Sequence, residues 1–68
     1  MIIDLITDRG IAWMRYQADI APRVGETIST LEPEAKTFEV TSVDHLVSPD
    51  VATDNMKQLL ITVNVEEI

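Results

Sequence analysis

The chain has 68 residues, of which 46% are hydrophobic, and its formal net charge is -7 because 12 acidic residues outnumber five basic ones. This balance argues against direct binding of nucleic acid, whose phosphates are bound mainly by Lys and Arg. The chain has no Cys, which excludes disulfides and thiolate chemistry, and no stretch approaches the roughly 18 apolar residues of a transmembrane helix. We therefore expect one cytoplasmic domain, residues 1–68, with no membrane contact.

The small size of the chain limits its core. A domain of about this length buries only about 60% of the surface that its unfolded chain exposes. With 46% hydrophobic residues, some apolar surface must remain outside such a core. We therefore expect the protein to associate with itself, with a host protein as a second possible partner.

The first two predicted strands are joined by a short turn. Residues 2–7 are rich in β-forming side chains, and Asp8-Arg9-Gly10 supplies turn chemistry, so the flanking strands should pair. Residues 11–20 then alternate between apolar even positions and polar odd positions, a pattern that favours a half-buried strand. Ten residues exceed the usual five or six, which predicts a bent or bulged strand shared between two sheets.

Two further strands are predicted in the middle of the chain. Residues 21–25 form a loop with Pro22 and Gly25, residues 26–30 a short strand, and residues 31–35 a turn. In the next strand Phe38 and Val40 share one parity, whereas Val43 and Val47 share the other. An inserted residue near Thr41-Ser42 would return both pairs to one face, so we expect a β-bulge there.

The stretch before the last strand allows two interpretations. Ser48-Pro49-Asp50 is typical of a helix start, with Ser48 as the N-cap and Pro49 in the first turn. Only about ten residues follow, so the segment to Gln58 is predicted to be either a short helix or a mobile loop. Alternating residues from Leu59 to Val65 predict the last strand.

Five short strands predict an all-β fold, a small five-stranded SH3-like barrel with a short helix or a long loop before the last strand. The alternative is an open meander that completes its core by dimerising. Residues 22–28 (Pro-Arg-Val-Gly-Glu-Thr-Ile), residues 38–45 and residues 61–65 resemble small SH3-like barrel proteins of phages and bacterial mobile elements. In those proteins an aromatic Val-x-x-Val strand follows a similar loop. The resemblance implies an accessory protein that acts by binding, and no catalytic residues follow from it.

The candidate interface lies on the second predicted strand and consists of Ile11, Trp13, Met14 and Arg15. In a regular strand Trp13 would lie on the polar, exposed face beside Arg15, and Trp with Arg is the composition of an interface hot spot. Alternatively, a bend in the strand turns Trp13 inward, where it caps the core. Tyr16 and Phe38 are most simply core residues.

Acidic residues suggest a second class of function. The candidate acidic surface contains Glu39, Asp44, Glu66 and Glu67. Such a surface can imitate DNA phosphates and occupy the groove of a basic host enzyme, although its more common role is solubility. Binding by such a mimic would collapse with salt, whereas binding through apolar residues would not.

Other chemistry has weaker support in the sequence. His45 follows Asp44, but neighbouring strand residues point to opposite faces, so Asp44 does not orient it as a catalytic base. We expect no metal site and no cofactor, because Asp50 and Asp54 lack the dense ligands of a calcium loop. A third class is a ligand-binding oligomer whose anion would be held by Arg15, Arg23 and Lys57. The sequence favours a non-enzymatic binding or self-association module.

Overall fold

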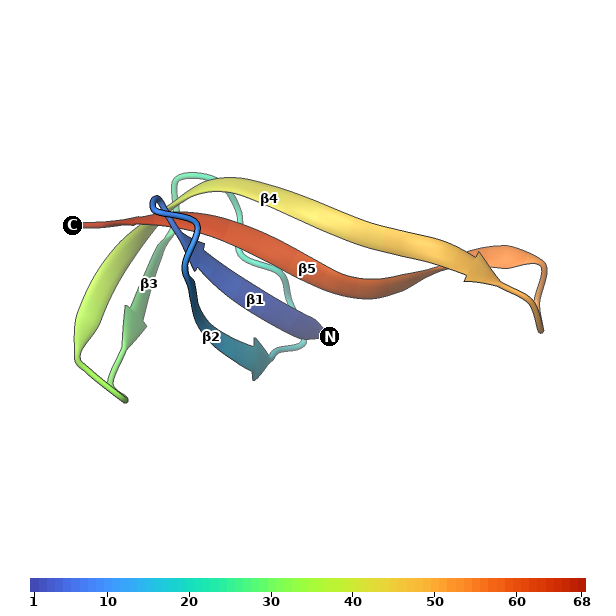
Figure 1. Cartoon of the computed structure of the whole chain (residues 1–68), viewed down its shortest axis with the longest axis horizontal. Helices are drawn as coiled ribbons and strands as arrows, with labels where there is room; N and C mark the ends of the chain where they lie inside the picture. The colour runs from blue at the N-terminus through green and yellow to red at the C-terminus, as the bar shows by residue number, and fades with distance from the viewer.

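The computed structural model describes all 68 residues as one five-stranded sheet without a helix (Figure 1). This confirms the predicted all-β fold and the predicted number of strands. The elements along the chain are β1 (Ile2–Thr7), β2 (Ala12–Gln17), β3 (Thr27–Thr30), β4 (Lys36–Asp50) and β5 (Asn55–Glu67).

The sheet curls into a half-barrel, consistent with a small five-stranded SH3-like barrel (Figure 1). Its strand order is β2-β1-β5-β4-β3, so β2 and β3 are the two edges. The predicted pairing of the first two strands is confirmed. The sequence pattern does not predict the parallel pairing of β1 with β5, which places Leu5 beside Val63. Because β2 and β3 are not hydrogen-bonded to each other, the half-barrel has an open side, which we call the seam.

The core lies on the inner face of the three central strands. Alternation along β1 and β5 sends every second side chain to this face, and the β4 residues beside them complete it. Trp13, Met14, Tyr16 and Ile28 pack against its margin. The fully buried apolar side chains are Ile3, Leu5, Phe38, Val40, Ile61, Val63 and Val65.

Bulges adjust the register where the sequence alternation breaks. Val40 pairs with Val65 and Ser42 with Asn64, which leaves Thr41 as the inserted residue and confirms the predicted bulge. The Thr41 hydroxyl donates a hydrogen bond to the Asn64 carbonyl at 3.1 Å. The alternation on both sides of Thr41 is therefore restored to one buried face.

The second strand is shorter than predicted. β2 ends at Gln17, and it belongs to the single sheet rather than being shared between two. The predicted bulge is present, because Leu5 pairs with Met14 and Ile6 with Ala12, which leaves Trp13 as the inserted residue. The chain leaves the sheet after Ala18, whose carbonyl accepts a hydrogen bond from the amino terminus at 2.8 Å.

The stretch from Ser48 to Gln58 is neither the predicted helix nor a mobile loop. β4 continues to Asp50, a turn follows, and β5 begins at Asn55. Backbone pairing with β5, including Pro49 opposite Met56, replaces the helical turn that the Ser-Pro-Asp pattern favoured. The turn closes because Asp50 accepts a hydrogen bond from the Ala52 amide at 3.0 Å and Asp54 takes a left-handed φ of 58°.

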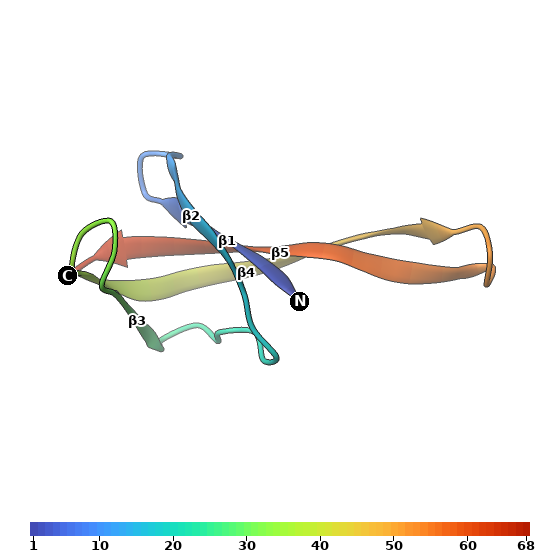
Figure 2. The same cartoon turned by 90° about the horizontal axis from the view of Figure 1, so that it is seen from below.

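The result is a two-stranded arm that extends from the half-barrel (Figures 1 and 2). The last β5 residue flanked by β1 is Ile61, opposite His45, so we define the arm as residues 46–60. The molecule measures 42 × 20 × 20 Å, and the arm gives it this length.

One cross-strand pair should weaken the sheet. Glu39 of β4 lies directly opposite Glu66 of β5, and both are exposed. Like charges at this position repel, so Glu66→Lys should raise the free energy of unfolding by about 0.2–1 kcal/mol. Urea denaturation at low salt would measure it. The neutral variant Glu66→Gln should give an intermediate value, and an equal or lower stability for Glu66→Lys would contradict the pairing.

Candidate functional site

The arm carries a concentration of exposed apolar side chains. The residues of this group are between 41% and 97% exposed, and none is part of the buried core. Exposed large apolar residues that gather on one element mark an interaction site more often than single scattered ones do. They are Leu46, Val47, Val51, Met56 and Leu59.

The register divides the arm into two faces, because directly opposed residues of paired strands share a face. Val47 pairs with Gln58 and Pro49 with Met56. The register places these residues on the same side of the sheet as the buried Ile61. At the base of the arm, His45 Nδ1 lies 2.7 Å from Gln58 Nε2. We call Val47, Pro49, Met56 and Gln58 the inner arm face.

The two faces differ in charge. The inner arm face contains no acidic or basic residue. The outer arm face consists of the cross-strand pairs that alternate with those of the inner face, and it contains one acidic and one basic residue. Its members are Leu46, Ser48, Asp50, Asn55, Lys57 and Leu60.

The edges of the arm are poorly suited to adding a further strand. Pro49 has no backbone N–H to offer. On the other strand the register shifts at Leu59, which is left unpaired, and Lys57 adds a charge. Proline, bulges and lysine are the usual devices that block edge-to-edge pairing. A partner of the arm should therefore contact its inner face rather than its edges.

The arm makes the chain more open than its mass requires. The accessible surface is 4896 Å², whereas a compact monomer of 7.6 kDa should expose about 4300 Å². The radius of gyration is 13.2 Å, against about 11 Å for a compact domain of this length. The excess of about 600 Å² approaches the roughly 800 Å² that each partner buries in a stable interface.

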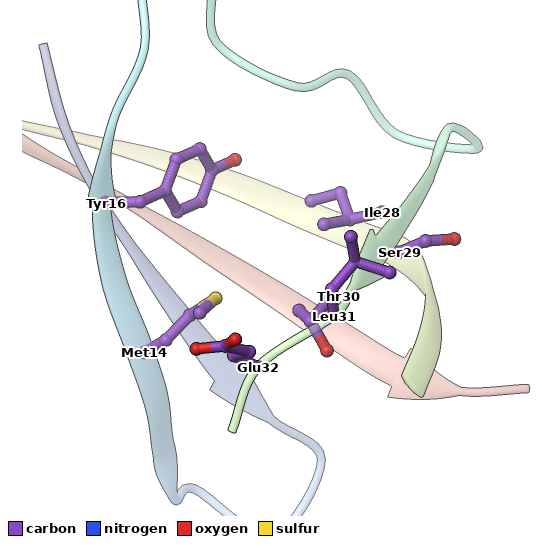
Figure 3. A pocket seen from close by; sticks show the side chains of 7 residues that line it. All are labelled: Met14, Tyr16, Ile28, Ser29, Thr30, Leu31 and Glu32. Carbon is purple, nitrogen blue, oxygen red and sulfur yellow. The ribbon is translucent and has the colours of Figure 1, made fainter. Parts of the chain in front are cut away.

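A second site lies in the seam. Met14 and Tyr16 of β2 point toward Ile28 of β3 across a pocket of about 230 Å³ (Figure 3). The pocket is completed by Ser29, Thr30, Leu31 and Glu32, and no basic residue lines it. Burial raises the pKa of Tyr16, and its hydroxyl makes no hydrogen bond within the chain.

Trp13 lies at another pocket, of about 440 Å³, at the opposite end of β2. Its ring centroid is 5.9 Å from that of Phe38, and Lys36 Nζ lies 5.0 Å from the indole. The hydrogen bond from Lys36 to Glu67, together with neighbouring negative charge, raises the pKa of the Lys36 ammonium. The buried Trp13 Nε1 has no hydrogen-bond partner.

The structure distributes the four predicted interface residues over different surroundings. Ile11 and Trp13 line the larger pocket, whereas Met14 lines the seam. Arg15 pairs instead with Asp4, with 2.7 Å between Nε and Oδ1, and the hydrogen bond from Arg15 lowers the pKa of the Asp4 carboxyl. The bulge therefore places Trp13 against the core margin, as in the second of the two sequence interpretations.

The predicted acidic surface is divided as well. Glu39, Asp44 and Glu66 alternate onto the outer face of the sheet, whereas Glu67 pairs with Lys36 beside the Trp13 pocket. Arg15, Arg23 and Lys57 lie on β2, the following loop and the arm, and none of them lines either pocket. His45, Asp44, Asp50 and Asp54 do not form a group that could hold a metal ion.

Sequence reasoning missed the inner arm face. The available signal was Asp54-Asn55, residues that accept left-handed turn conformations, between two β-rich stretches that could pair as a hairpin. Comparisons with protein families, curated proteins and solved structures find no match for this chain. No helix in the structure is long and apolar enough to cross a membrane.

Replacement of Trp13 distinguishes a packing role from a contact role. Because the indole packs on Phe38, Trp13→Ala should lower the free energy of unfolding by about 2–4 kcal/mol. Trp13→Phe should cost less, since it keeps a ring and removes the unpaired N–H. Urea denaturation followed by far-UV circular dichroism measures both. The control is Ile11→Ala, at an exposed residue of the same pocket, and a similar loss there would contradict the packing role.

The environment of the seam can be measured through Tyr16, the only tyrosine in the chain. Burial disfavours the phenolate, so its pKa should lie above the ordinary value of about 10 and return to that value in concentrated urea. The contribution of this group to stability is complete below the unfolded pKa and is lost as pH rises through the folded pKa. Absorbance titration at 295 nm gives both values, and equal folded and unfolded pKa values would show that Tyr16 is solvated.

Proposed function

We propose that this protein is a non-enzymatic binding module that acts through protein–protein contacts made by its arm. One observation carries the proposal: the inner arm face is uncharged and uncovered, with Val47, Pro49 and Met56 beside a single amide, on a ribbon that stands away from the core. An isolated two-stranded hairpin is marginally stable in water, so an arm of this kind gains stability when another surface covers it. Burial of its apolar area supplies the driving force, at about 25 cal/mol per Å² before ordering costs.

In this proposal, two of the interface residues predicted from the sequence stabilise the core instead of forming the contact. Trp13 and Met14 pack against the margin of the core from which β4 and β5 extend. The resemblance to accessory proteins of phages and bacterial mobile elements suggests a cytoplasmic setting. Self-association and attachment to a host protein are both compatible with an apolar arm.

A mimic of nucleic acid is the second candidate, because Glu39, Asp44 and Glu66 gather on the outer face of the sheet. Only this face would be used, and its partner would be basic. Salt separates the two functions: a contact through the inner arm face persists at high ionic strength, whereas a contact through exposed carboxylates is screened.

The test is a capture experiment with three tagged baits: the unaltered chain, Val47→Asp and Ser48→Asp. The two altered residues are neighbours on β4 that lie on opposite faces, and Ser48 is opposite Lys57. Each bait is co-expressed with an untagged copy in bacteria and recovered from nuclease-treated lysate at low and high salt. We expect the unaltered chain and Ser48→Asp to retain an untagged copy or another protein at high salt, and Val47→Asp to lose it.

Two outcomes would contradict this function. Capture of nothing by any bait would show that the chain is not a binding module under these conditions. Equal capture by Val47→Asp and the unaltered chain would show that the arm is not the contact. Release of a basic nucleic-acid enzyme by salt, unaffected by either variant, would support the mimic instead.

A further inference from the structure

We propose that the partner of the inner arm face is the same face of a second copy, with the two arms packed face to face and antiparallel about a two-fold axis near Val47 and Gln58. This inference rests on the proposed function and names its partner. In this arrangement the two arms together form a four-stranded unit of two layers.

The charge of the chain restricts which surface two copies can share. Two copies of a chain with a net charge of -7 repel each other, so a stable contact between them must avoid facing carboxylates. The inner arm face meets this requirement, because all four of its residues are uncharged. The arm residues Asp50 and Lys57 belong to the outer face, and Asp54 belongs to the turn. Copies can therefore meet on this face without placing like charges opposite each other.

The large exposed surface of the chain also favours the pairing of two copies. The chain exposes about 600 Å² more than a compact monomer of its mass. A stable dimer buries roughly 800 Å² on each partner. Antiparallel arms that cover each other's inner faces would remove part of this excess from water. Val51 at the tip is 97% exposed and would then approach the body of the other copy.

The direction follows from the charges at the tip. In a parallel pair the two tips would meet and bring two copies of Asp50 and Asp54 together. In an antiparallel pair each acidic tip lies at the far end from the other tip, and the two bodies lie at opposite ends. The same residues contact each other in both copies, so the assembly closes at two chains.

The first measurement is the mass in solution by sedimentation equilibrium over a range of concentrations. We expect the unaltered chain and Ser48→Asp to reach twice the monomer mass of 7.6 kDa. Because Val47→Asp places a carboxylate at the centre of the contact, its dissociation constant should rise about thirtyfold or more. Fluorescence of Trp13, which packs on Phe38 in the body, shows whether each variant is folded. Met56→Asp provides a second variant of the same face.

The second measurement is the distance between the tips. The chain contains no Cys, so a single spin label can be attached through Thr53→Cys in the turn. At about 3.3 Å per strand residue, antiparallel arms should hold the two labelled backbones roughly 30 Å apart, whereas parallel arms would hold them roughly 10 Å apart. Electron double resonance measures this separation.

The two measurements test self-pairing, the contact face and the orientation of the arms separately. A monomer at all concentrations overturns self-pairing, and the proposed function then stands only if the capture experiment finds another protein lost with Val47→Asp. A dimer that Val47→Asp and Met56→Asp leave intact overturns both the inner arm face as the contact and the function assigned to it. A dimer with adjacent tips overturns the antiparallel arrangement alone.

Discussion

The pairing of β4 with β5 is the interaction on which the rest of the structure depends. Its inner end supplies Phe38, Val40, Val63 and Val65, more than half of the buried apolar residues. Its outer end continues past the last residue that β1 covers and forms the arm. One ladder therefore anchors the small core and also holds an apolar face away from that core. A change that weakens the ladder near Val40 would affect both, whereas a change beyond His45 affects the arm alone.

The same ladder explains why the half-barrel stays open. β1 occupies the free edge of β5, and β3 pairs with only the first residues of β4, so β2 and β3 end as separate edges. No backbone pairing closes the seam between them, which is a pocket lined by side chains, with Met14 and Tyr16 facing Ile28 (Figure 3). At the other end of β2, the bulge at Trp13 turns the indole onto Phe38. A chain with so few buried residues thus uses its three aromatic side chains at the margin and centre of one core.

Much of this fold could be predicted from residue patterns, because strands with one buried face alternate strictly. The five strands and the bulge at Thr41 follow from that alternation, and the slip in parity between Val40 and Val43 is a local signal. The arm could not be predicted in the same way. Ser48-Pro49-Asp50 carries a stronger local signal for a helix than for a strand, and the backbone pairing with Asn55, Met56 and Lys57 that overrides it involves residues on the far side of a turn. The parallel pairing of β1 with β5 is likewise non-local. The sequence pattern therefore predicts a contact at Ile11, Trp13, Met14 and Arg15, and it does not predict the uncovered face on the hairpin.

The hydrogen bond between His45 and Gln58 at the base of the arm affects which partner the inner arm face can bind. A His and a Gln within an apolar strip would oppose its burial if each lost its hydrogen bonds to water. His45 Nδ1 and Gln58 Nε2 lie 2.7 Å apart, so each satisfies part of the other's requirement before any partner arrives. The remaining polar atoms of Gln58 lie near the proposed two-fold axis, where the same side chain of a second copy offers an amide donor and an amide acceptor. In a symmetric dimer the Gln58 amide of each copy can hydrogen-bond to that of the other, whereas an apolar surface of an unrelated protein offers no such donor or acceptor. The placement of one amide in an otherwise apolar face therefore favours a second copy over a generic hydrophobic partner, and in the proposed dimer this amide would set the register of the two arms.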